Sequence, residues 1–195
     1  MDIMKFITEQ LSNPQTIQML GNSIQAEPNK VQQATQLGIP ALLQALNRNA
    51  STPQGAESLA KALDQHQDDK IEDINGFLGT IDSQDANKML QHIFSGKTER
   101  VENTLARQTG LESSQVSGLL TQLAPLMMGA LAQQKKQQNV APTDLSGLLS
   151  GLTKQTTANT NSGLMGIITD LLDTDNDGSV VDEVGSLLQG FLRKK

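Results

Sequence analysis

The segment of the sequence best suited to chemistry is an acidic stretch near the C-terminus, DTDNDGSVVDEV, at residues 173–184. Asp173, Asp175 and Asp177 alternate along it, and Gly178 follows, where a sharp turn favours glycine. Alternating carboxylates on a tight turn converge on one point, and hard oxygen ligands suit Ca²⁺. The spacing therefore predicts a calcium-binding loop.

The residues that follow the glycine complete this loop only in part. Ser179 would offer its backbone carbonyl and Val180 an inward apolar side chain, so the stretch resembles the calcium loop of the EF-hand family. That family places a bidentate Glu at position twelve, where this chain has Val184. If neither Asp182 nor Glu183 completes the coordination shell of the ion, we expect weak binding. The resemblance implies Ca²⁺ as a cofactor, with the ligand set Asp173, Asp175, Asp177, Ser179, Asp182 and Glu183.

A metal-free interpretation of the same stretch stays open. Asp177 and Gly178 form a common turn, and Ser179 followed by Asp182 is a helix-capping pattern. Under both interpretations the loop joins two helices, because apolar residues at helical spacing flank it. They are Leu164, Ile167, Ile168 and Leu171 before the loop, and Val184, Leu187, Leu188 and Phe191 after it.

Helical spacing of apolar residues continues through the rest of the chain. Ile3, Ile7 and Leu11 form one such stripe, and Thr52–Pro53 is typical of a capped helix start. Two-residue alternation bounded by hairpin turns is missing, so a β-sheet is not expected. The sequence predicts an all-α fold, a bundle of many helices.

Two long helical stretches look alike. Val31–Leu46 and Val116–Leu131 align without gaps at an offset of 85 residues, and the alignment pairs Pro40 with Pro125. Each proline either kinks a helix or divides two shorter ones. Either the chain contains a duplicated helical unit, or two helices of biased composition match by chance.

Composition places boundaries along the chain. Residues 1–152 are expected to form a helical domain, with the repeats around 14–66 and 98–152. The polar stretch TKQTTANTNS within 153–162 is typical of a linker, and residues 163–195 form the helix, acidic loop and helix.

Charge and residue usage exclude several classes of function. The net charge is −6, basic residues are scattered, and the four aromatic residues are all Phe, so nucleic-acid binding is not expected. Cysteine is absent, and no apolar run approaches the length of a membrane span. We therefore expect a cytoplasmic protein. His66 and His92 have no catalytic partners at recognisable spacing, so we expect structural roles for them and no enzyme.

The segments LQHIFSG (Leu90–Gly96) and LAPLMMGAL (Leu123–Leu131), together with the DTDNDGS loop, carry a wider resemblance. The chain resembles a bacterial family named only as domain of unknown function 937, over most of its first 150 residues. The resemblance implies a helical fold and a bacterial source, and it assigns no catalytic residue.

These observations favour a non-enzymatic interaction or scaffold module, which binds a protein partner or a second copy of itself and has a weak or structural Ca²⁺ site. Two alternatives stay open. One is a calcium-responsive binding protein, and the other is a carrier that holds a small apolar ligand between its helices.

Overall fold

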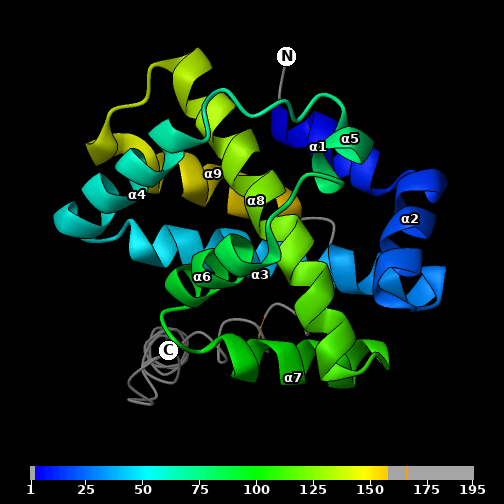
Figure 1. Ribbon diagram of the computed structural model, residues 1–195. Helices are drawn as coiled ribbons and strands as arrows, with labels where there is room; N and C mark the ends of the chain where they lie inside the picture. The colour runs from blue at the N-terminus through cyan, green and yellow to red at the C-terminus, as the bar shows by residue number, and fades with distance from the viewer. Residues whose placement is uncertain (1–2, 158–165, 167–195) are drawn as a thin grey trace, which may run out of the picture.

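In the computed structural model, which describes residues 3–157 and Gly166, the chain forms helices and no strand within the described part. This confirms the predicted all-α class. Figure 1 shows the helices packed around two long central ones. The helices are α1 (Ile3–Leu11), α2 (Pro14–Ile24), α3 (Pro28–Asn49), α4 (Pro53–Gln65), α5 (Ile74–Leu78), α6 (Ser83–Ile93), α7 (Thr98–Thr109), α8 (Ser113–Gln138) and α9 (Leu145–Thr157), with a short 3₁₀ turn at Pro142–Asp144.

Caps encoded in the sequence start several of these helices. The Thr52 hydroxyl accepts a hydrogen bond of 3.1 Å from the backbone N–H of Gly55, with Pro53 in the first helical position, as predicted. At α8 the cap is Glu112. The Gln115 side chain accepts from the Glu112 N–H at 3.0 Å, which completes the start of that helix.

The two central helices, α3 and α8, each contain a proline in the interior. Pro40 and Pro125 do not divide them: each helix continues through its proline, over 22 and 26 residues respectively. Figure 1 shows α8 running obliquely across α3. Both helices are buried over most of their length, and Val31 and Val116 near their starts are fully buried.

The shorter helices pack onto the two central ones in a partly crossed pattern, since α2, α4, α6 and α7 each contact both α3 and α8. From the N-terminal half, α1, α2 and α4 all contact α8, which belongs to the C-terminal half. From the C-terminal half, α6, α7 and α9 all contact α3. The buried apolar side chains consequently form one continuous cluster, to which both halves of the described chain contribute.

Small residues allow the close approaches in this core. A Cβ atom at Gly38 would lie 3.3 Å from Leu120 on α8, and one at Gly129 would lie 2.7 Å from the Ile71 side chain. Glycine at these two positions lets a neighbouring side chain lie directly against the helix backbone.

The last helix runs further than the sequence suggested. The expected domain boundary followed Leu152, but α9 continues to Thr157, into the stretch interpreted as linker. The hydroxyls of Thr153 and Thr156 donate to the carbonyls of Leu149 and Leu152, at 2.8 and 3.0 Å. These bonds satisfy the two hydroxyls within the last turns of α9.

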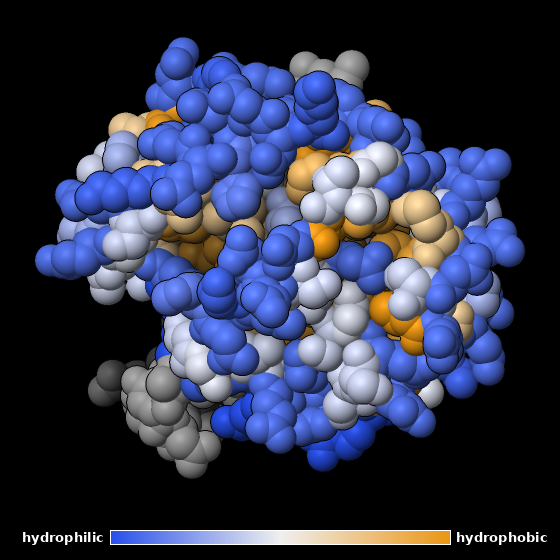
Figure 2. Space-filling view, in the orientation of Figure 1, coloured by the Kyte–Doolittle hydropathy of each residue, from blue (hydrophilic) through white to orange (hydrophobic). Residues whose placement is uncertain are grey.

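The face of the molecule seen in Figure 2 is mainly hydrophilic. Figure 2 shows apolar groups on one face chiefly in crevices between helices. None of the described helices combines the length and apolarity that a membrane crossing requires.

Candidate functional site

The predicted calcium ligands lie outside the described residues, so this site stays a prediction. They are Asp173, Asp175, Asp177, Ser179, Asp182 and Glu183. Within the described part of the chain, no three acidic or histidine side chains gather as metal ligands would.

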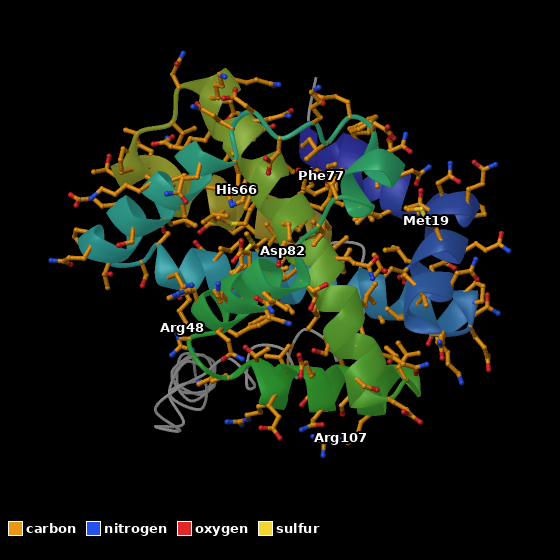
Figure 3. All side chains as sticks on the ribbon, viewed as in Figure 1. Met19, Arg48, His66, Phe77, Asp82 and Arg107 are labelled. Atoms are coloured by element: carbon orange, nitrogen blue, oxygen red, sulfur yellow. The ribbon has the colours of Figure 1, made fainter. Side chains whose placement is uncertain are left out.

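The two histidines lie apart in the fold. His66 follows α4, and its Nδ1 lies 2.8 Å from Oδ2 of Asp69, with about a quarter of each side chain exposed (Figure 3). His92 is exposed on α6, where its backbone carbonyl accepts from the Asn49 amide at 3.3 Å. Each histidine therefore has a local contact typical of a structural role, and that role stays a prediction.

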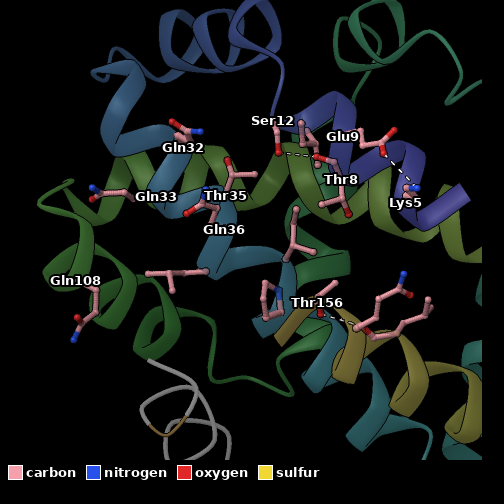
Figure 4. A pocket seen from close by; sticks show the side chains of 16 residues that line it. Lys5, Thr8, Glu9, Ser12, Gln32, Gln33, Thr35, Gln36, Gln108 and Thr156 are labelled. Carbon is pink, nitrogen blue, oxygen red and sulfur yellow. Dashed lines mark hydrogen bonds and ion pairs between the residues drawn. The ribbon is translucent and has the colours of Figure 1, made fainter. Parts of the chain in front are cut away.

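A groove of about 780 Å³ opens between α1, α3 and α9, with one residue of α7 at its edge (Figure 4). We call it the α1–α3–α9 groove. It is lined by Lys5, Thr8, Glu9, Leu11, Ser12, Gln32, Gln33, Thr35, Gln36, Leu37, Ile39, Pro40, Gln108, Leu152, Gln155 and Thr156.

The groove exists because the two halves of the fold pack unequally. Helix α6 lies against both central helices, and its Asn87 side-chain oxygen accepts a 3.1 Å hydrogen bond from the Thr121 hydroxyl on α8. Helix α1 packs on α8 but makes little contact with α3. The space that this leaves beside α3 is the groove.

Uncharged amides dominate the rim of the groove. Gln32, Gln33 and Gln36 project from α3 and are exposed, as are Gln108 and Gln155 on α7 and α9. Each primary amide can both donate and accept hydrogen bonds. The rim therefore suits a ligand that also presents donors and acceptors together, such as the backbone and polar side chains of a polypeptide.

The charged rim residues compensate one another. The Lys5 amino group lies 3.9 Å from the Glu9 carboxylate, one turn away on α1, and both side chains are about two-thirds exposed. Such an exposed pair contributes little free energy. The groove consequently has no strong preference for an anion or a cation.

The wall formed by α3 contains a polar atom without a partner. Thr35 is only 3 % exposed, and its hydroxyl makes no hydrogen bond. An unsatisfied buried hydroxyl costs about 1–3 kcal/mol. Nearby, Pro40 has no N–H, so the Gln36 carbonyl lacks its usual helical donor.

The floor of the groove is apolar. Leu11, Leu37, Ile39 and Leu152 line it from three helices, and each is at most 6 % exposed. Apolar side chains of a ligand would bury surface against this floor, at about 25 cal/mol per Å². The groove thus combines an amide rim with an apolar base.

The lining does not assemble a catalytic apparatus. It contains neither His nor Cys, and the Ser12 hydroxyl donates to the Thr8 carbonyl of its own helix at 2.8 Å. An activated nucleophile needs an adjacent base and a group that orients it. The groove offers the contacts that non-covalent binding needs, an apolar floor and hydrogen-bonding groups at the rim.

Sequence reasoning missed this groove. From the sequence alone, Pro40 was expected only to kink a helix or divide two shorter ones, and the glutamines of α3 were given no role. The available signal was the grouping of Gln32, Gln33, Thr35 and Gln36 within one turn before Pro40. That signal alone does not show that α1 leaves this face of α3 uncovered.

Comparison with known proteins identifies a family without assigning an activity. The sequence profile described as "Bacterial protein of unknown function (DUF937)" matches residues 7–134 and 132–194. No curated protein and no solved structure gives a significant match. Because the profile covers nearly the whole chain, the protein belongs to this family of bacterial proteins of unknown function.

Proposed function

We propose that this protein is a non-enzymatic interaction module that binds a helical polypeptide segment in the α1–α3–α9 groove. The observation that carries the proposal is the amide rim beside an apolar floor. Helices that dock in grooves anchor apolar side chains at positions i, i+3, i+4 and i+7 and keep their polar groups at the edge.

The groove favours a polypeptide over the other ligands considered. A small apolar ligand gains nothing from five rim glutamines, which it would desolvate without bonding. Nucleobases and sugar rings commonly stack on aromatic side chains, and the lining contains none. A peptide helix presents both apolar side chains and hydrogen-bonding groups, which matches the two parts of the groove.

We also propose that the module consists of two related units, α1–α4 and α6–α9. The central prolines are 85 residues apart, and so are Gln25 and Gly110, which end α2 and α7 in left-handed conformations with φ of 54° and 67°. Helix α8 is four residues longer than α3. The offset then becomes 89 residues, which aligns the apolar stripes of α4 and α9: Ala56, Leu59, Ala60 and Leu63 with Leu145, Leu148, Leu149 and Leu152.

A selection from a displayed peptide library tests the binding function. The library presents short helical peptides with varied apolar residues at i, i+3, i+4 and i+7 and varied polar residues elsewhere. We expect full-length protein to select binders that share an apolar stripe. The variant Gln36→Arg should weaken their binding at least tenfold, because the arginine places a larger charged group within the groove.

The matched control is Gln91→Arg, which makes the same exchange at an exposed position of α6 outside the groove. It should bind the selected peptides as the natural protein does. The binding proposal fails if no striped binder emerges, or if Gln36→Arg and Gln91→Arg bind the selected peptides equally.

The acidic loop supports a second, separate proposal of a weak or structural Ca²⁺ site. Its support is the spacing of Asp173, Asp175 and Asp177 before Gly178. The displaced closing carboxylate favours a structural role over a calcium-responsive switch. This site is independent of the groove, and a calcium titration tests it.

A further inference from the structure

The short helix α5 contains the dipeptide Asn75-Gly76, which is the single Asn-Gly pair in the sequence. Such a pair can modify itself, because glycine has no side chain to keep its backbone nitrogen away from the neighbouring carboxamide. The Asn75 side chain is exposed, and it makes no hydrogen bond within the part of the chain that the structure describes. Its carboxamide is therefore open to attack from the backbone.

The attacking nitrogen is held in place by one exposed side chain. Gly76 lies in the first turn of α5, where a helix offers no backbone acceptor. Its N–H donates instead to the Asp73 carboxylate, at 3.0 Å. Both residues are exposed, so water competes for this hydrogen bond. The bond keeps the Gly76 nitrogen in the helical arrangement, in which it does not approach Cγ of Asn75.

Helix α5 has few other contacts that keep it folded. It has five residues and lies between loops (Figure 1). Ile74 is buried, at 4 % exposure, whereas Phe77 and Leu78 are half-buried against the core. Helices this short are marginal without tertiary packing. Opening of α5 should therefore cost less free energy than opening of the long central helices.

We propose that Asn75-Gly76 is a self-modification site, at which deamidation releases α5 from α8. When α5 opens, the Gly76 nitrogen attacks Cγ of Asn75. The new N–Cγ bond closes a cyclic succinimide, the Cγ–Nδ2 bond breaks, and the Gly76 proton leaves with the amide nitrogen as ammonia. Water then opens the ring at either carbonyl, which gives aspartate or isoaspartate.

Isoaspartate changes the backbone of α5 as well as its charge. The main chain then runs through Cγ of residue 75, which inserts a methylene group into the helix. The hydrogen bonds from the Phe77 N–H to the Asp73 carbonyl, at 2.9 Å, and from the Gly79 N–H to the Asn75 carbonyl, at 3.3 Å, lose their register. The contacts of α5 with α8 depend on that helical turn. Because the ammonia is lost to solvent, refolding does not restore the amide.

Mass spectrometry of the full-length protein tests the site. The protein is aged in mildly alkaline buffer, since the backbone nitrogen attacks faster once it is deprotonated, and is then digested. We expect the peptide with residue 75 to exchange its amide for a carboxylate and to separate into aspartate and isoaspartate forms. Asn22, an exposed residue of α2 that precedes serine, is the internal reference and should react more slowly. Equal conversion of Asn22 and Asn75 would overturn the proposal.

The variant Asp73→Ala tests whether the cap restrains the reaction. Its loss should speed the conversion of Asn75 about fivefold, because α5 opens more often. The matched control is Asp82→Ala, which removes the cap of α6, where the Asp82 carboxylate accepts from the Gln84 N–H at 2.8 Å. This control should leave the rate at Asn75 unchanged. Equal rates in the two variants would reject Asp73 as the group that restrains Gly76.

Hydrogen exchange of the aged protein tests the release of α5. Isoaspartate chains, separated from unmodified ones, should lose protection of the Phe77 and Gly79 amides while α3 and α8 keep theirs. The variant Asn75→Gln, whose longer side chain closes a ring far more slowly, should keep this protection after the same ageing. Protection that survives isoaspartate formation would contradict release. The site is independent of the α1–α3–α9 groove, so the proposed function stands or fails separately.

Discussion

Single residues decide how closely elements approach in this fold. Gly129 on α8 faces Ile71 and Asp69, and a Cβ atom there would lie 2.7 and 3.3 Å from their side chains. A Cβ atom at Gly147, on α9, would have no neighbouring atom within 4 Å. The two helical glycines therefore provide a matched pair, one crowded and one free.

Gly129→Ala should lower the free energy of unfolding by about 1–3 kcal/mol, because the added methyl group overpacks the Ile71 contact. Gly147→Ala should raise it by about 0.5–1 kcal/mol, since alanine is the better helix former and meets no neighbour. Urea unfolding followed by circular dichroism measures both. If both variants raised the free energy of unfolding, the side chains around Gly129 would accommodate the added methyl group without a loss of stability.

The calcium prediction also belongs to the scale of residues. Calorimetric titration of Ca²⁺ into chelator-treated protein should give binding heat with a Kd of about 10⁻⁴–10⁻³ M, the range of weak sites. Asp175→Ala should abolish the heat, because it removes a central carboxylate. Asp170→Ala, outside the predicted ligand set, should leave it unchanged. Heat that survives Asp175→Ala would reject this loop as the site.

At the scale of elements, local sequence was sufficient for much of the fold. The cap at Thr52 and the stripe of Val116 and Leu119 act within one or two turns, so they could be interpreted without knowing the tertiary structure. The continuity of α3 through Pro40 could not be predicted from local sequence, because packing on both sides of the helix decides whether a proline divides it. The extension of α9 was missed for a related reason: Thr153 and Thr156 bond back to their own helix.

The Gln115 side chain links the start of α8 to the end of α2, so substituting it tests how much contacts between helices contribute to stability. Its oxygen accepts from the Glu112 N–H at the start of α8, and its amide donates to the Gln25 carbonyl beyond α2 at 2.8 Å. Gln115→Ala should cost about 1–2 kcal/mol of stability, since it removes a cap and a hydrogen bond between helices.

The control for this change is Gln137→Ala, at an exposed position in the last turn of the same helix. It should alter the free energy of unfolding by less than about 0.5 kcal/mol. Chemical denaturation of both variants measures the difference. Equal effects would show that the Gln115 hydrogen bonds make no net contribution.

At the scale of the whole molecule, the crossed packing is the main feature that the sequence did not reveal. Apolar stripes predict which face of a helix is buried, but they do not say which partner covers it. The candidate groove was missed for the same reason: Gln32 and Gln36 signal a polar face, and only the placement of α1 leaves an opening beside it.

The shared core predicts that the helical body unfolds as one unit. Because α1, α2 and α4 contact α8 while α6, α7 and α9 contact α3, neither half keeps all of its contacts when the other is lost. Scanning calorimetry should give a single transition for the body, with calorimetric and van't Hoff enthalpies that agree. Two separable transitions, one lost on substituting Leu42 and the other on substituting Leu123, would contradict this.

The crossed packing also has a consequence for synthesis on the ribosome. Helices α1 to α4 are complete once residue 65 has been translated, but α8, which α1, α2 and α4 each contact, ends only at residue 138. At about 5–20 residues per second, the interval is roughly 4–15 s. During that time the apolar faces that pack on α8 have no partner, which makes the nascent N-terminal helices natural clients for chaperones that act before chain release.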